Sequence, residues 1–256
     1  MSDPIIYKKD GAISWIIFNR PEARNALNYE MADSLETAID LARRDSDVRV
    51  TIVTGEGNSF MAGSDIKELS ERDVLSGWAN SQRRQRIFSL LDSMEIPTIA
   101  AINGFALGAG CEVAASCSLR LAARQAKFGQ LEINLGLIPG AGGTQRLPRL
   151  IGKGRALELL LTGKMINAEE AFRIGLVNQV VDDTLLKSEA FDLAMAIAQK
   201  SPMAVKGILK AVSRGLEGTI DIGNDIESGL FGICLSTKEA KDALRSFLER
   251  KGRSAH

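Results

Sequence analysis

The stretch INGFALGAGCE, residues 102–112, follows an apolar segment and carries glycines at positions 104, 108 and 110. Glycine is destabilising inside regular structure, and it marks places where the backbone turns sharply or approaches another segment. We predict a strand that ends at Asn103–Gly104, a glycine loop, and a helix that begins near Cys111. Unpaired N–H groups at the start of that helix point at whatever lies in front of it, so this turn is suited to stabilise negative charge.

A second stretch, FMAGSDIKEL at residues 60–69, has the same character. Gly63 permits a close approach, and the N–H groups of Ser64 and Asp65 open a short helix. Two N–H groups that converge on one carbonyl oxygen form an oxyanion hole, in which each donor stabilises the transition state by roughly 3–4 kcal/mol. Taken alone, each stretch is more typical of an ordinary strand-to-helix turn. Neither fits the GxGxxG or GxxxxGK[ST] phosphate motifs.

Composition excludes several partners. The chain has 256 residues, of which 45% are hydrophobic, and 32 basic residues balance 32 acidic ones. No overall field therefore draws it to nucleic acid or to an acidic membrane surface, and an anionic ligand must be held locally. No apolar run approaches the ~20 residues that span a bilayer. The segment 12–18 is interpreted as a first strand rather than a signal peptide, so we expect a cytoplasmic protein or a mature organelle form.

Histidine and cysteine usage limits the catalytic mechanisms and metal sites that this chain can have. The only histidine is His256, the last residue, which excludes catalytic triads, HExxH zinc sites and histidine bases. The cysteines Cys111, Cys117 and Cys234 are odd in number and lack CxxC spacing, so we expect buried free thiols and no metal site. Acid-base chemistry in this chain must therefore depend mainly on carboxylates.

Strand-like and helical patterns alternate along the first two hundred or so residues. We predict strands at 12–18, 48–55 and 96–104, helices at 28–47 and about 78–94, a helix followed by a strand at 111–123, and mostly turns and short strands at 126–152. From residue 152 the pattern is helical almost to the end. The chain is thus expected to be α/β to about residue 200, with a helical tail.

Five stretches resemble the successive motifs of the crotonase superfamily, and most closely its enoyl-CoA hydratases. They are NRPEARNALN (19–28), FMAGSDIKEL (60–69), AAINGFALGAGCEVA (100–114), AKFGQLEINLGLIPGAGGTQRL (126–147) and LTGKMINAEEAFRIGLVNQVV (161–181). They occur in the family's order over nearly the whole chain. The resemblance implies a spiral of repeated ββα units over residues 1–200 and a helical oligomerisation region over residues 201–256. It also implies a homo-oligomer, either a trimer or a dimer of trimers.

The resemblance assigns the oxyanion-hole donors to Ser64 and Ala109, where the commonest family residues are alanine and glycine. Because the backbone donates, neither change should remove the hole. The supporting glycines are Gly63, Gly108, Gly110 and Gly140, of which Gly140 would close the site.

By the same resemblance, the catalytic pair is Glu112 and Glu132. Glu112 would hold and deprotonate a water that attacks C3, and Glu132 would deliver a proton to C2. A single glutamate after a glycine loop more often stabilises the N-terminus of a helix than acts as an acid catalyst. Because two such glutamates occur in a chain without a usable histidine, we interpret them as catalytic.

Coenzyme A binding is implied at loop residues and at two positions near the end of the chain. These residues are Arg24, Ala26, Leu27, Ala62, Asp65, Ile66, Lys67, Phe247 and Arg250. For Arg24, Lys67, Phe247 and Arg250, a solvated helix end with a core phenylalanine is an equally good interpretation.

The implied activity is enoyl-CoA hydratase, which interconverts a trans-2-enoyl-CoA and a 3-hydroxyacyl-CoA. Coenzyme A is part of the substrate, and no metal or redox cofactor is expected. Isomerisation of a Δ3 to a Δ2 double bond is an alternative on the same fold, and a non-catalytic acyl-CoA-binding or RNA-binding role is a further one. The acyl group is left open, because its pocket would be formed by residues 69–85, where Trp78 either faces the acyl chain or packs internally.

Overall fold

The structure is a computed structural model that describes the backbone of residues 3–253 and the side chains of residues 3–249. The chain forms two compact units, of which the first ends at Met195 and the second begins at Ala196. This division falls within helix α8 (Leu186–Ala198), a few residues before the boundary expected after residue 200.

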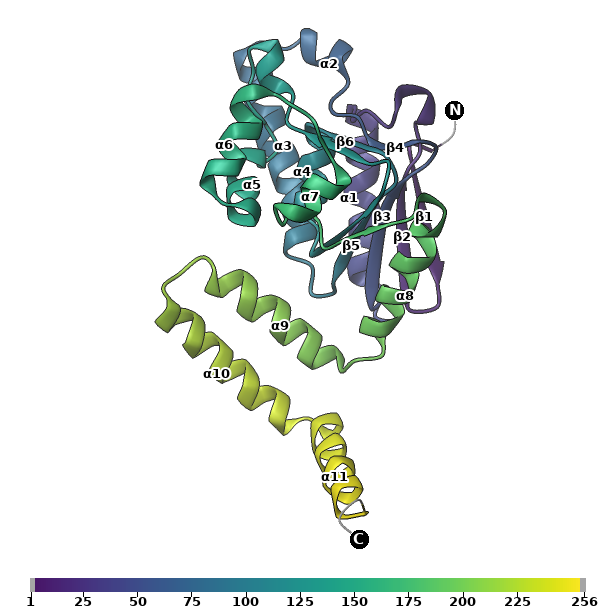
Figure 1. The fold of residues 1–256 in the computed structure, drawn as a ribbon, viewed down its shortest axis with the longest axis vertical. Helices are drawn as coiled ribbons and strands as arrows, with labels where there is room; N and C mark the ends of the chain where they lie inside the picture. The colour runs from purple at the N-terminus through teal and green to yellow at the C-terminus, as the bar shows by residue number, and fades with distance from the viewer. Residues whose placement is uncertain (1–2, 254–256) are drawn as a thin grey trace. The chain divides into compact units, whose positions relative to one another are not determined.

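The larger of the two sheets in the first unit has six strands (Figure 1). Its order is β1 (Ile5–Asp10), β2 (Ile13–Phe18), β3 (Val50–Gly55), β5 (Thr98–Ile102), β7 (Leu119–Ala123) and β10 (Gln179–Val181). Only the β1–β2 pair is antiparallel. The central strands β3 and β5 are buried along their whole length, as is usual for parallel strands covered on both faces.

A second sheet contains β4 (Ser59–Met61), β6 (Phe105–Leu107), β8 (Lys127–Gly129) and β9 (Ile166–Asn167), in that order. The pairs β4–β6 and β6–β8 are parallel. The chain alternates between the sheets: β3, β5 and β7 lie in the first, and each continues directly into β4, β6 or β8 in the second. Helical segments follow each pair, so the expected α/β class with repeated ββα units is confirmed.

The helices of the first unit, except the short α2, bury apolar residues. They are α1 (Tyr29–Arg44), α2 (Ile66–Ser70), α3 (Val74–Asp92), α4 (Ala109–Ala115), α5 (Gly143–Ile151), α6 (Lys153–Thr162) and α7 (Ala168–Arg173), followed by α8. In α1, Asn28 caps the N-terminus by accepting the Met31 N–H, and the buried residues Met31, Leu35 and Ile39 follow at helical spacing. The Phe18 and Phe60 rings, 5.2 Å apart and edge to face, join the core.

Several predicted elements were wrong in detail. Strand β1 precedes the segment predicted as the first strand, and α3 begins at Val74, where Asp73 and Ser76 form a capping box. The segment 143–151, expected as turn, is helix α5 despite Pro148, because Leu147 and Ile151 are buried one turn apart. The region after residue 152, expected to be helical, also contains the short strands β9 and β10.

The second unit is helical, with α9 (Pro202–Gly215), α10 (Ile220–Ser236) and α11 (Lys238–Arg253). Helix α10 packs along α9, with Gly215 and Gly223 in contact. Apolar side chains remain exposed on all three helices, among them Val212, Phe231 and Leu248. Across residues 3–253, none of the helices combines the length and the apolar character that a membrane span requires. Cytoplasmic location stays a prediction.

Candidate active site

The candidate site is built where neighbouring strands of the second sheet end. Strands β4, β6 and β8 are adjacent and parallel, so their carboxyl ends lie at one edge of the sheet. Ser64 follows the end of β4, Ala109 follows β6, and Glu132 follows β8. The sheet register therefore brings together three residues that are far apart in the sequence. Ligands in open α/β sheets bind at this kind of edge.

Glycines let the backbone approach closely at this edge. A Cβ atom at Gly110 would lie 2.0 Å from the Met61 carbonyl oxygen, and one at Gly104 would lie 2.0 Å from that of Asn58. Any side chain at these positions would collide with rigid backbone. The glycines of residues 102–112 are thus explained by the packing of β6 and α4 against β4.

Two backbone N–H groups are available for a ligand at the start of α2 and α4. No backbone hydrogen bond among the described residues uses the N–H of Ser64 or of Ala109. The preceding glycines, Gly63 and Gly108, have φ values of 97° and 48°, and a Cβ atom on Gly108 would lie 3.7 Å from Gly63 Cα. The two turns are therefore neighbours, as an oxyanion hole requires.

Glu112 lies on α4 and is 2% exposed. Its Oε1 accepts hydrogen bonds from the backbone N–H groups of Ala141 and Gly143, each at 2.8 Å. Burial raises the pKa of the Glu112 carboxyl above its usual value, while these two N–H groups act in the opposite direction because they favour the charged form. Glu112 is consequently a buried carboxylate with a fixed orientation.

The loop that holds Glu112 is tied to α3. Ser81 donates to the Gly140 carbonyl oxygen at 2.5 Å, and Arg146 Nη1 donates to that of Ala141 at 2.9 Å. Arg146 also bonds Asp92 through Nε at 2.6 Å. Gly140, which was expected to close the site beside Glu132, thus lies in the loop whose next residues bind Glu112. These bonds fix the two N–H donors relative to the rest of the site.

Glu132 begins a single turn of 3-10 helix, Glu132–Leu135, and is half-buried. A Cβ atom at Gly108 would lie 2.8 Å from Glu132 Oε1, so the carboxylate lies directly beside the Gly108 turn. When the buried Gln130 amide presents its nitrogen, it donates to both carboxylate oxygens at 3.3 and 3.1 Å. Burial, together with the charge of Glu112, raises the pKa of the Glu132 carboxyl from 4.5 to about 7.

Most of the residues predicted to bind coenzyme A lie beside the Ser64 turn, although Leu27 among them is fully buried. Ala62 N–H donates to the Arg24 carbonyl oxygen, and Leu27 forms an isolated parallel bridge with Ser64. Asp65 caps α2 by accepting the Lys67 N–H, and Arg24, Ile66 and Lys67 are exposed. The intervening Ala26 is partly buried.

The two distal predictions lie in the second unit. Phe247 is 56% exposed on α11. The side chain of Arg250 lies outside the described residues. Their predicted role in coenzyme A binding stays a prediction.

Sequence reasoning missed the groups that support the two glutamates. Ala141 and Gly143 act through backbone N–H groups, which any residue type can supply. Gln130 stands two residues before Glu132 and carries no motif of its own. Ser64 Oγ accepts a hydrogen bond at 2.6 Å from Arg84, a residue of α3 whose sequence context gives no sign of this contact.

The thiols and the carboxylates do not form a metal site. Across residues 3–253, no three His, Cys, Asp or Glu side chains are grouped to hold a metal ion. Cys111 and Cys117 are buried and free, and burial raises the pKa of each thiol to about 12. They are therefore poor nucleophiles at neutral pH.

Comparison with known proteins identifies the family. A profile described as "Enoyl-CoA hydratase/isomerase" matches residues 8–254. The chain is 44% identical to the short-chain-enoyl-CoA hydratase of Clostridium acetobutylicum, over 96% of this chain and 95% of that protein. It is 43% identical to the crotonyl-CoA hydratase of Syntrophomonas wolfei, with the same coverage. The crystal structure of an enoyl-CoA hydratase from Bacillus anthracis superposes with a TM-score of 0.92 at 36% identity and covers 96% of both chains.

This chain belongs to the enoyl-CoA hydratase/isomerase family, which confirms the resemblance seen in the five motifs.

Proposed function

We propose that this chain is an enoyl-CoA hydratase that adds water across the C2=C3 double bond of a short trans-2-enoyl-CoA. The observation that carries the proposal is the placement of two differently held glutamates around one pair of free N–H groups. The names of the relatives, one a short-chain and one a crotonyl-CoA hydratase, support a short acyl group.

In the proposed reaction, the thioester carbonyl oxygen accepts hydrogen bonds from the Ser64 and Ala109 N–H groups. Glu112 removes a proton from water as the water oxygen forms a bond to C3. The π electrons of the double bond move toward the thioester, and the resulting enolate oxygen is stabilised by the two N–H donors. C2 then takes a proton from Glu132, whose raised pKa leaves it partly protonated near neutral pH.

The two glutamates exchange the leftover proton to restore the starting state, so the net change is the addition of one water. The proposed chemistry uses side chains, backbone N–H groups and the thioester, and coenzyme A enters as part of the substrate.

Hydration of crotonyl-CoA tests the proposal, because the conjugated thioester absorbance disappears when C2=C3 is saturated. We expect rapid loss of absorbance with the purified chain and formation of 3-hydroxybutyryl-CoA. A folded protein that binds coenzyme A but leaves crotonyl-CoA unchanged, and instead converts a 3-enoyl-CoA to its 2-enoyl isomer, would contradict the hydratase proposal in favour of isomerisation.

We also propose that the chain forms homo-trimers or dimers of trimers through its second unit. Residues of α10 and α11, including Phe231, Leu235 and Leu244, line an apolar groove of about 420 Å³. Exposed apolar surface of this extent is typical of a subunit interface. Light scattering measures the mass directly, and a monomer at micromolar concentration would contradict this proposal.

A further inference from the structure

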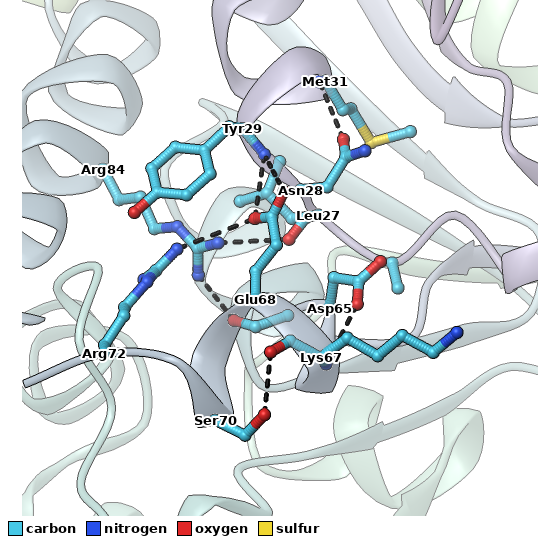
Figure 2. Close-up of polar contacts among 12 residues, drawn as sticks. Leu27, Asn28, Tyr29, Met31, Asp65, Lys67, Glu68, Ser70, Arg72 and Arg84 are labelled. Carbon is cyan, nitrogen blue, oxygen red and sulfur yellow. Dashed lines mark hydrogen bonds and ion pairs between the residues drawn. The ribbon is translucent and has the colours of Figure 1, made fainter.

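Two buried arginines lie beside the Ser64 turn and are not used by the proposed mechanism. Arg84, on α3, is 6% exposed, and the side chain of Arg72, which follows α2, is also 6% exposed. Figure 2 shows their guanidinium groups close together, near Glu68 and the Tyr29 ring. The Arg72 guanidinium carbon lies 4.7 Å from the centre of that ring. Buried arginines are rare unless they are paired.

Their hydrogen bonds are incomplete. Arg84 donates through Nη1 to Ser64 Oγ at 2.6 Å and through Nη2 to the Leu27 carbonyl oxygen at 3.1 Å. In the part of the chain that the structure describes, no hydrogen-bond partner is found for Arg84 Nε, nor for Nε and Nη2 of Arg72. A guanidinium has five N–H groups and no acceptor, so only an acceptor from elsewhere satisfies these donors.

The nearby carboxylates are only loosely placed relative to the two guanidinium groups. Glu68 is the carboxylate nearest to Arg72, with Oε2 3.7 Å from Nη2, and both of its oxygens already accept the Tyr29 N–H. The charge of Glu112 also acts on Arg84, but among the described residues neither Glu68 nor Glu112 accepts a hydrogen bond from either guanidinium group. Burial, followed by the charge of Arg72, lowers the pKa of Arg84 to about 10.

Arg84 links the pair of arginines to the proposed reaction centre. Arg84 contacts the hydroxyl of Ser64, the residue whose N–H is proposed to bind the thioester oxygen. One turn earlier on α3, Ser81 contacts Gly140 in the loop that holds Glu112. The charge of Glu112 acts on Arg84, which places both in one electrostatic environment. An acyl chain that starts at Ser64 and extends toward α3 thus ends near the two guanidinium groups.

We propose that Arg72 and Arg84 bind a carboxylate at the far end of the acyl group, so that the substrate class is short trans-2-enoyl-CoA thioesters that end in a carboxylate. This inference rests on the proposed hydratase function. A carboxylate accepts paired N–H bonds from guanidinium groups and balances their charge. Near the buried Glu112 and the half-buried Glu132, an acyl carboxylate requires cations of this kind.

The test compares two substrates on the wild-type protein. One is the mono-CoA thioester of trans-2-hexenedioic acid, and the other is its terminal amide, which has the same shape without the charge. We expect kcat/KM to be at least about tenfold higher for the acid, since a hydrogen bond to a charged group typically supplies that much discrimination. Equal values, or a preference for the amide, would overturn the inference.

Substitutions then locate the effect. Arg72→Met and Arg84→Met should each reduce the acid-to-amide ratio at least about fivefold, whatever they do to the absolute rates. Arg86→Met is the matched control, because Arg86 lies on the same helix but pairs with Glu36 at the surface. A ratio unchanged in both test variants, or reduced equally in the control, would overturn the assignment.

Crotonyl-CoA separates this inference from the proposed function. Hydration of crotonyl-CoA without preference for the acid contradicts only the carboxylate site. Absence of hydration with all three thioesters contradicts the hydratase proposal and, with it, this inference.

Discussion

Glu112 and Glu132 are the same chemical group in two different settings. Glu112 is 2% exposed and is fixed by two backbone N–H bonds from a loop that Arg146 and Ser81 tie to α3. Glu132 is half-buried at the start of a one-turn helix, and its neighbours are the Gly108 turn and the Gln130 amide. Burial raises the pKa of both carboxyl groups, but only Glu112 receives backbone N–H donors from a facing loop, which act against that shift.

The difference separates their proposed roles. Backbone donors favour the charged form, which suits a base that accepts a proton from water. Desolvation favours the neutral form and brings the pKa of Glu132 to about 7, which suits a proton donor near neutral pH. The environments, rather than the residue type, therefore assign base and acid.

Replacing either carboxylate should have the largest effect. Glu112→Gln and Glu132→Gln keep the size and an acceptor oxygen but cannot exchange protons, so we expect kcat for crotonyl-CoA hydration to fall about 1,000-fold in each. Steady-state kinetics measure this, with Glu36→Gln at the surface as the control. If either variant retained more than about a tenth of kcat, its glutamate would not be an essential proton-transfer group.

Two glycine substitutions test the two settings without removing a carboxylate. In Gly143→Ala, the new Cβ atom would lie 3.1 Å from Glu112 Cγ and 2.8 Å from the end of the Gln130 amide group. In Gly108→Ala it would lie 2.8 Å from Glu132 Oε1. We expect kcat to fall about 100-fold in each, because a small displacement of a catalytic group is enough.

Gly154→Ala on α6 is the matched control for Gly143, since nothing lies within 4 Å of the added atom, and Gly108→Ala carries the additional strain of a φ of 48°. Gly154→Ala should keep full activity. Comparable losses in all three variants would show that the effect is general destabilisation and not displacement of a carboxylate.

The pH dependence should distinguish the acid from the base. The acid must be protonated, so kcat/KM for hydration should fall about tenfold per pH unit above about pH 7 as Glu132 ionises. On the acid side, kcat/KM should fall as Glu112 becomes protonated. In Glu132→Gln, the residual activity should lose the alkaline decline. Persistence of that decline in the variant would assign it to another group.

The smallest expected effect concerns stability. The pKa of Glu132 is raised in the folded state, so its contribution is fully present below about pH 4.5 and is lost as pH rises through about 7. Glu132→Gln removes this loss and should stabilise the protein at about pH 8, relative to wild type, by roughly 1–3 kcal/mol more than at about pH 4. Thermal unfolding at both values measures it, and an equal difference at both would contradict the raised pKa.

The sequence predicted the glycine turns and both glutamates but not what holds them. The turn at Asn103–Gly104 and the helix with Glu112 lie within residues 102–112, where glycine spacing and the following apolar run give a local signal. The donors of Ala141 and Gly143 are backbone groups thirty or so residues away, which leave no mark in residue type. The pairing of Ser64 with Arg84 depends on how α3 packs, which no local pattern reports.

The missed elements have similar causes. Strands β9 and β10 contain two and three residues, too few to show an alternation. Helix α5 contains Pro148 and begins at a glycine, both signals against a helix, and only the burial of Leu147 and Ile151 in the tertiary structure outweighs them.

Because β4, β6 and β8 must be paired before Ser64, Ala109 and Glu132 meet, we expect the site to form late in folding. Helices can form early from local contacts, whereas parallel pairing between distant strands is slow. During refolding, the circular dichroism of the helices should therefore recover before hydratase activity does. The recovery of enzymatic activity therefore reports the last step of folding, in which β8 pairs with β6 beside β4.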